Sequence, residues 1–188
     1  MSSIEDDSTP RTLTDLIEEV LRRHGVQFVR EQAEELAKRL SSLGVRSTLE
    51  ILNCVLDPEC LRFRPESRAP VERAFEEVFG VGSLVRTQIA EELRRHRLDE
   101  LVSVDAVYES YRELELLLQE LRKEGLIKSR AYRQTLIRAA IADAVLRLAK
   151  PNELADVMDF LEDFLGWDRA LKLLTEIRGL QHYLYNPR

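Results

Sequence analysis

Few residues in this sequence could perform chemistry: three histidines, two cysteines and one unusually acidic stretch. His24 and His96 each end a stretch of helical periodicity, and His182 lies near the C-terminus. A histidine at a helix C-terminus usually interacts with the helix dipole and with solvent. No strained or glycine-rich turn supports a nucleophile, as a catalytic triad would need. We therefore predict no catalytic residue.

Metal and cofactor sites are not predicted either. Di-metal helical bundles use Glu-x-x-His pairs, whereas Glu92 and His96 are one position further apart. The segment Gly80-Val81-Gly82 lacks the third glycine of a dinucleotide-binding loop and the Gly-Lys-Ser/Thr ending of a P-loop. Cys54 and Cys60 lack the close pairing and companion histidines of a zinc site. We expect them to be small buried thiols in a reducing compartment.

The most unusual charge pattern lies between Asn152 and Gly166, where acidic residues occur without any lysine or arginine. At steps of three and four they fall on one side of a helix, opposite apolar residues. Carboxylates near a helix C-terminus oppose the helix dipole, so a group outside the helix could compensate. We predict a partner-binding acidic face formed by Asp156, Asp159, Glu162 and Asp163. A weak divalent-ion site and a solvated face balanced by a neighbouring helix remain alternatives.

Arginine-rich segments offer the opposite charge. The predicted basic partner-binding patches contain Arg62, Arg64 and Arg68 in one segment and Arg94, Arg95 and Arg97 in another. Patches of opposite charge would suit head-to-tail contact with a partner or a second copy. Asp143, in a nearly apolar helix, is instead expected to pair with Arg147 four residues later.

Helices must position these residues, because no stretch shows the period-two alternation of strands. Each of the seven glycines follows a stretch of helical periodicity, where a helix should end. Helices are predicted over residues 12–24, 28–43, 48–56, 70–79, 83–96, 104–124, 129–149, 153–165 and 168–178. Residues 47–50 have the pattern of a capping box, and Ser103, Ser129 and Asp168 are candidate caps. Residues 57–70 contain three prolines and predict a loop.

The predicted fold class is all-α, either a compact multi-helix bundle or an irregular stack of helical hairpins, with about nine or ten helices. The 104–124 helix carries a heptad-like seam, and the alanine-rich 129–149 helix is apolar on nearly all sides, which predicts a central position.

We expect a disordered acidic tail over residues 1–10, an N-terminal lobe over 11–102, a C-terminal lobe over 103–180 packed on it as one domain, and an aromatic tail over 181–188.

Composition is that of a globular protein, with 188 residues of which 44% are hydrophobic and 33% charged. The first ten residues lack the basic and apolar regions of a secretion signal, and no run of eighteen apolar residues occurs. We therefore expect a soluble cytoplasmic protein with no membrane contact. The net charge of −6 disfavours nucleic acid as the main partner.

Two segments resemble known families. Residues 84–128 resemble a winged-helix DNA-binding unit in which 104–124 would be the recognition helix, although that helix is acidic and another helix stands where the wing belongs. Residues 91–101 resemble the closing Arg-x-Asp-Leu pattern of death-effector-type six-helix bundles, except that Glu100 separates Asp99 from Leu101. The first resemblance implies a nucleic-acid-binding regulator that uses the Arg94–Arg97 region, and the second implies a self-associating helical module.

The predicted function is that of a non-enzymatic protein-interaction, adaptor or scaffold component that acts through charged and apolar helical faces. Its partner would be another protein or a second copy of the chain, and no cofactor is expected. The nucleic-acid-binding regulator is the first alternative. An enzyme with an unfamiliar helical site is the second.

Overall fold

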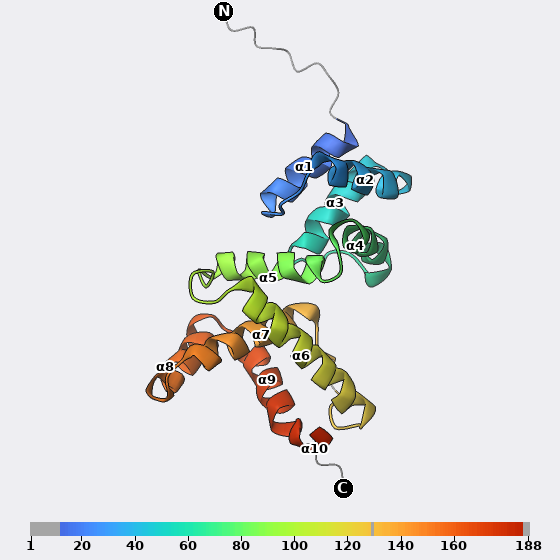
Figure 1. The fold of residues 1–188 in the computed structure, drawn as a ribbon. Helices are drawn as coiled ribbons and strands as arrows, with labels where there is room; N and C mark the ends of the chain where they lie inside the picture. Colours follow the sequence, from blue (N-terminus) through green and yellow to red (C-terminus); the bar gives the residue numbers. More distant parts are fainter. Residues whose placement is uncertain (1–11, 129, 186–188) are drawn as a thin grey trace, which may run out of the picture. The chain divides into compact units, whose positions relative to one another are not determined.

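The computed structural model describes residues 12–128 and 130–185, and within these ranges the regular elements are all helical (Figure 1). The all-α class is therefore confirmed. The contacts between Cα atoms divide the chain into two compact units, an N-terminal unit of residues 1–91 and a C-terminal unit of residues 92–188. The predicted lobe boundary at 102 and the packing of both lobes as one domain stay predictions. The predicted tail over 1–10 lies outside the described residues.

The N-terminal unit contains α1 (Leu13–Arg23), α2 (Arg30–Leu40), α3 (Val45–Leu56), α4 (Pro65–Phe79) and most of α5 (Ser83–Arg95), with a short 3-10 turn at Ser41–Leu43. Helices α2 and α3 each pack against both α1 and α4. Their buried apolar residues form one core, whose fully buried members include Ile17, Leu21, Leu36, Leu52 and Phe75. Burial of these faces, rather than intrinsic helix propensity, stabilises such short helices.

Helix α3 begins differently from the sequence prediction. The capping box at residues 47–50 does not form, because α3 already starts at Val45 and Gly44 is its N-cap, with a φ of 79°. The hydroxyl of Thr48 instead donates to the carbonyl oxygen of Leu40, at 3.2 Å, and is buried there. The positive φ at Gly44 lets the chain turn directly from the preceding 3-10 turn into α3.

Helix α4 takes in part of the predicted loop. It begins at Pro65 rather than at residue 70, so only residues 57–64 lie outside helices. Proline is well suited to the first helical position, because the N–H that it lacks has no intrahelical partner there. Pro70 lies inside the helix and removes one backbone hydrogen bond. Burial of Val71, Ala74 and Phe75 compensates, since all three lie in the core.

The C-terminal unit contains α6 (Val104–Lys123), α7 (Arg133–Leu148), α8 (Leu154–Asp159), the π-helix η3 (Phe160–Phe164), α9 (Asp168–Leu180) and the single turn α10 (His182–Tyr185). A short 3-10 turn, η2 (Pro151–Glu153), precedes α8. Helix α7 contacts α6, α8 and α9, which confirms the predicted central position of this segment. Ala139, Ala140 and Ala142 are fully buried and let the neighbouring helices approach closely.

Other local predictions have mixed outcomes. The hydroxyl oxygen of Ser103 accepts a hydrogen bond from the backbone N–H of Ala106, as expected for a cap. Asp168 is the first residue of α9 rather than its cap, Gly179 lies within that helix, and Ser129 lies outside the described residues. The predicted 153–165 helix changes to π-helical winding at Phe160.

The described residues contain no strand that could form a wing, and no helix among them is long and apolar enough to cross a membrane.

Candidate functional site

The predicted acidic face lies on α8 and η3 in the C-terminal unit. Asp156, Asp159, Glu162 and Asp163 all have exposed side chains. The segment contacts α7 and α9, and the fully buried Leu161 anchors it to the unit. The structure therefore brings the four predicted residues together on one short segment at the surface.

Two aromatic rings of this segment lie on the π-helical turn of η3. The backbone N–H of Leu165 donates to the carbonyl oxygen of Phe160 at 3.0 Å, five residues back instead of four. Phe160 and Phe164 are four residues apart, so their side chains lie on the same side of this turn. The rings of Phe160 and Phe164 are accordingly stacked, with centroids 5.2 Å apart and planes 17° apart. Such local π-turns occur often at functional sites.

The apolar side of this segment is only partly covered. Leu161 is fully buried, but Phe164 is 78% exposed, Leu154 41% and Phe160 37%. Leu154 and Phe164, which were predicted to lie opposite the acids, are therefore exposed on the same short segment as the acids. Phe160 is four residues from Asp156 and three from Asp163, so it neighbours both on the helix surface. We call the carboxylates of Asp156, Asp159, Glu162 and Asp163, together with Leu154, Phe160 and Phe164, the acidic–aromatic surface.

The four carboxylates of this surface have no counter-charge among the residues that the structure describes. Within residues 12–128 and 130–185, none of them takes part in a salt bridge or a side-chain hydrogen bond. A solvated face balanced by a neighbouring helix would have placed an arginine or lysine within reach. These carboxylates therefore add negative charge to the surface without a close ion pair among the described residues.

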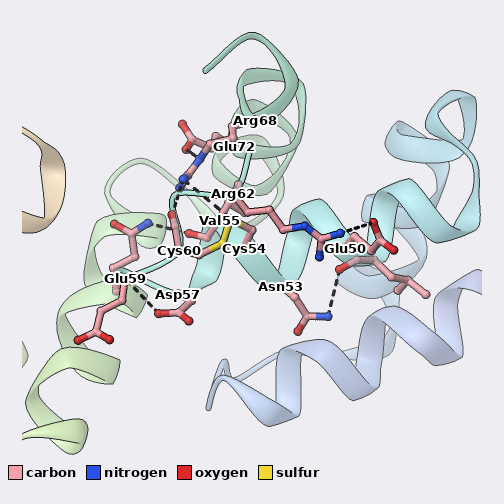
Figure 2. The surroundings of a disulfide bond; sticks show 12 residues. Glu50, Asn53, Cys54, Val55, Asp57, Glu59, Cys60, Arg62, Arg68 and Glu72 are labelled. Carbon is pink, nitrogen blue, oxygen red and sulfur yellow. Dashed lines mark hydrogen bonds and ion pairs between the residues drawn. A yellow bond between two sulfur atoms is a disulfide. The ribbon is translucent and has the colours of Figure 1, made fainter. Parts of the chain in front are cut away.

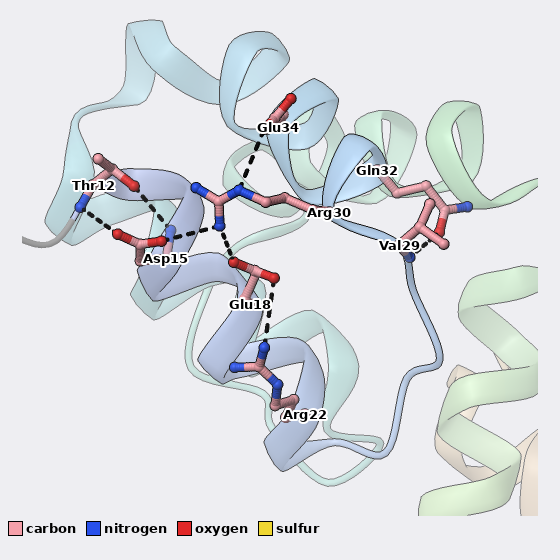
Figure 3. A network of polar contacts seen from close by, with 8 residues as sticks. All are labelled: Thr12, Asp15, Glu18, Arg22, Val29, Arg30, Gln32 and Glu34. Carbon is pink, nitrogen blue, oxygen red and sulfur yellow. Dashed lines mark hydrogen bonds and ion pairs between the residues drawn. The ribbon is translucent and has the colours of Figure 1, made fainter.

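The acidic residues of α1 provide a contrast (Figure 3). The guanidinium of Arg30 pairs with Asp15 at 3.1 Å and with Glu34 at 3.4 Å, and it also pairs with Glu18. Glu18, which is only 9% exposed, also lies 3.5 Å from Arg22. Hydrogen bonds from the backbone and side chain of Thr12, followed by that from Arg30, lower the pKa of Asp15.

The predicted basic residues of the N-terminal unit have different roles from one another. Arg62 lies 3.7 Å from Glu50 and over the ring of Phe63. Arg64 is exposed and is the N-cap of α4. The side chain of Arg68 is only 15% exposed, and its Nη1 donates to the carbonyl oxygen of Cys60 at 2.8 Å. The structure thus directs Arg68 inward, away from a shared patch with Arg62 and Arg64.

The second basic cluster belongs to the C-terminal unit. Arg94 and Arg95 end α5, and all three arginines of this cluster are exposed. Arg97 follows with a φ of 57°, an uncommon conformation for a residue other than glycine. The side chain of Arg95 lies 4.0 Å from the buried carboxylate of Glu92. Whether either arginine cluster binds a partner stays a prediction.

Asp143 has the partner that the sequence predicted and a closer one that it did not. Arg147 lies 3.3 Å from its carboxylate, as expected from their spacing. Arg178 of α9 donates to both carboxylate oxygens, at 2.9 and 3.3 Å, and also pairs with Glu113 of α6. This network joins α6, α7 and α9, and no sequence signal indicates it because its members are far apart along the chain.

The predicted environment of the first two histidines is wrong. His24 ends α1 but is 7% exposed, with Nδ1 2.8 Å from Glu91 and Nε2 3.1 Å from the side-chain oxygen of Asn53. Burial lowers the pKa of His24, but the hydrogen bond and charge of Glu91, with Asn53, outweigh it and raise the pKa above 6.5. His96 is half-buried, and its Nε2 lies 3.1 Å from Glu92. The ring of His24 therefore joins α1 to α3 and α5, whereas the ring of His96 pairs within the end of α5 and packs edge-on against Trp167.

The prediction of free cysteines is also wrong, because Cys54 and Cys60 form a disulfide with their Cα atoms 5.2 Å apart (Figure 2). Cys54 lies in the last turns of α3. After α3 the chain turns back, and the backbone N–H of Cys60 donates to the carbonyl oxygen of Asp57 at 3.2 Å. This turn brings Cys60 alongside the helix end, which six-residue spacing in a sequence does not indicate by itself.

The C-terminal aromatic segment packs on its own unit. Helix α10 contacts α9, and Tyr183, Leu184 and Tyr185 line a cleft of about 460 Å³ together with residues of α6. The α6 residues in this cleft are Leu116, Leu117, Glu120 and Glu124. Residues 186–188 of the predicted tail lie outside the described ranges.

Comparison of the chain with family models, curated proteins and solved structures finds no match. Neither the winged-helix resemblance nor the death-effector resemblance is therefore supported by a family match.

Proposed function

We propose that this chain is a non-enzymatic protein-interaction component, and that its acidic–aromatic surface binds a basic amphipathic segment of a partner protein. The observation that carries the proposal is the combination of four carboxylates that have no ion-pair partner among the described residues with the exposed, stacked rings of Phe160 and Phe164. Lysine or arginine side chains would pair with the carboxylates, and apolar side chains of the same segment would cover the rings.

The energetics favour a mixed surface of this kind. Exposed phenylalanine rings remain in contact with water unless a partner covers them, and aromatic side chains are enriched where proteins bind one another. The carboxylates would contribute chiefly to the rate of association and to the choice of partner, because charge pairs at an interface rim add little net affinity. Binding should therefore weaken as salt is added, while the aromatic contribution persists.

Cytoplasmic location is part of the proposal and has one observation against it. Stable disulfides are rare in the cytosol, where thiols are kept reduced, and those that occur are usually transient or redox-sensing. The Cys54–Cys60 disulfide must accordingly be exchangeable if the protein acts there.

A site-specific cross-linking experiment tests the proposal. A photo-reactive phenylalanine analogue replaces Phe164, which is 78% exposed, in the full chain. A second version carries it at Tyr132, a 70% exposed position of the same unit. Both are irradiated in an extract of the cells that make the protein, and cross-linked peptides are sequenced by mass spectrometry. We expect capture from position 164 only, on a segment that contains both basic and apolar residues.

Matched charge variants complete the test. D159N/E162Q/D163N removes three charges from the acidic–aromatic surface, and D99N/E100Q/E109Q removes three from exposed positions elsewhere in the same unit. The first set should slow capture at position 164 and lower its yield severalfold, and the second should leave both unchanged. Equal capture from positions 164 and 132, capture of acidic segments, or identical behaviour of the two charge sets would overturn the proposal.

A further inference from the structure

The Cys54–Cys60 disulfide joins two sulfur atoms in different environments. Cys54 is 4% exposed and lies in the core at the end of α3. Cys60 lies on the following turn and is half-buried, next to the exposed Glu59 and Leu61. A thiol in solution can therefore approach the Cys60 side of the disulfide more easily than the Cys54 side. Access of this kind decides which sulfur of a disulfide is attacked.

Arg68 makes the two sulfurs differ in charge environment as well (Figure 2). Its Nη1 lies 4.0 Å from the Sγ of Cys54, within the range of a hydrogen bond to sulfur, and it also donates to the carbonyl oxygen of Cys60. On the other side of the guanidinium, the Nε of Arg68 donates to the carboxylate of Glu72 at 3.3 Å. The positive charge is thus fixed beside the sulfur that would leave if Cys60 were attacked. A nearby guanidinium stabilises a thiolate, and a more stable thiolate leaves faster.

From this asymmetry we infer that Cys60 is a site of S-thiolation, at which a low-molecular-weight thiol opens the disulfide. The thiolate of that small molecule attacks the Sγ of Cys60, forms a new sulfur–sulfur bond and breaks the bond to Cys54. The electron pair of the broken bond passes to the Sγ of Cys54, which becomes a thiolate beside Arg68. A second thiolate can then attack the sulfur of the small molecule, release it as its symmetrical disulfide and leave Cys60 as a thiolate.

Opening the disulfide affects the packing of the N-terminal unit. The carbonyl oxygen of Val55, next to Cys54, accepts a 2.7 Å hydrogen bond from the buried side chain of Gln88 in α5. The bond from Arg68 to the Cys60 carbonyl connects the same turn to α4. A small-molecule adduct on Cys60 adds bulk at this junction. We therefore expect the segment 57–64 to become more accessible to proteases after modification.

The test uses the full chain and glutathione as the probe thiol. Wild-type protein is incubated with reduced glutathione, quenched by acid at intervals and analysed by intact and tandem mass spectrometry. We expect a mixed disulfide that forms on Cys60 rather than on Cys54. Two single variants check the assignment with oxidised glutathione. C54S, which retains Cys60, should be modified about tenfold faster than C60S, which retains the buried Cys54.

Two arginine variants separate the contact of Arg68 from general charge. R68Q removes the guanidinium beside Cys54 and should slow opening of the wild-type disulfide about threefold to tenfold. R62Q removes an equal charge from the same loop region. The side chain of Arg62 is 68% exposed and pairs with Glu50, so its loss should leave the rate of disulfide opening unchanged. Circular dichroism establishes that each variant is folded before its rate is compared.

Several outcomes would overturn the inference. Modification mainly at Cys54, equal rates for C54S and C60S, or equal rates for R68Q and R62Q would each contradict the assigned roles. Complete resistance of the folded wild-type disulfide to glutathione would do so too. None of these outcomes bears on the acidic–aromatic surface, because the two proposals rest on different units of the chain.

Discussion

The acidic residues of α1 and those of the α8–η3 segment have the same chemistry and opposite surroundings. Asp15 and Glu18 share the guanidinium of Arg30, and the result is a closed network within the N-terminal unit (Figure 3). Asp159 and Glu162 have no such partner among the described residues. Internal pairing satisfies the first set, so its role is structural. The second set is left to interact with water or with another molecule.

Asp143 extends this comparison into the interior of the C-terminal unit. It is 7% exposed and bound by two arginines, of which Arg178 contacts both oxygens. Removing one partner of a buried pair leaves the other without compensation, whereas removing an unpaired surface charge costs almost nothing. The buried Asp143, the partly exposed α1 network and the α8–η3 carboxylates therefore predict effects on the free energy of unfolding that decrease in that order.

The largest effect is expected from Asp143→Asn. The substitution keeps the shape of the side chain but leaves Arg178 without its interior carboxylate, so the free energy of unfolding should fall by about 3 kcal/mol. Urea unfolding followed by the fluorescence of Trp167, which is buried in the same unit, measures the change. Glu109→Gln, at an exposed position of α6, is the control. A loss no greater than that of the control would contradict the structural role of the network.

A pH-dependent effect is expected from His24 in the N-terminal unit. Its folded-state pKa is raised above 6.5, so the stabilisation by Glu91 is fully present below pH 6.5 and is lost as the pH rises through the folded-state value. The free energy of unfolding, measured by circular dichroism in urea, should therefore decrease from pH 6 towards pH 9. His24→Gln should remove this part of the pH dependence. An unchanged pH profile in the variant would assign the dependence to other groups.

A smaller effect is expected from Glu18→Gln. The carboxylate is largely buried but its partners Arg22 and Arg30 are mostly exposed, with side-chain exposures of 64% and 51%. Solvent screens pairs of this kind, so the midpoint of thermal unfolding should fall by only a few degrees. The difference from wild type should shrink in 1 M salt. A salt-independent loss would instead indicate that packing of the side chain matters more than its charge.

The smallest effect is expected from D159N/E162Q/D163N. These carboxylates have no counter-charge to lose within residues 12–128 and 130–185. They also lie close to one another near a helix C-terminus, where the helix dipole disfavours them. The free energy of unfolding should therefore change by no more than about 0.5 kcal/mol, or increase slightly. Fluorescence of Trp167 in urea provides the measurement. A substantial loss would show that the residues stabilise the unit and would weaken the case for a binding surface.

Local features of this chain could be predicted from its sequence because their physical causes are local. Helical periodicity located the main helices, the serine at 103 located a cap, and the lack of basic residues located the acidic face. The start of α4 was predicted too late, because three prolines suggested a loop, although Pro65 is an acceptable first residue of a helix. The disulfide required a turn geometry that residue spacing does not specify.

By itself the sequence determined the all-α class, the approximate helix boundaries and which carboxylates gather on the α8–η3 segment, since each depends on residues within a few turns of one another. Only the tertiary structure decided which charges are satisfied. Arg178 reaches Asp143 from 35 residues away, and Glu91 reaches His24 from 67 residues away. Pairing across such separations follows from helix packing, which no local pattern encodes. The same packing leaves the carboxylates of the acidic–aromatic surface without a partner in the part of the chain that the structure describes, and the rings of Phe160 and Phe164 in contact with solvent.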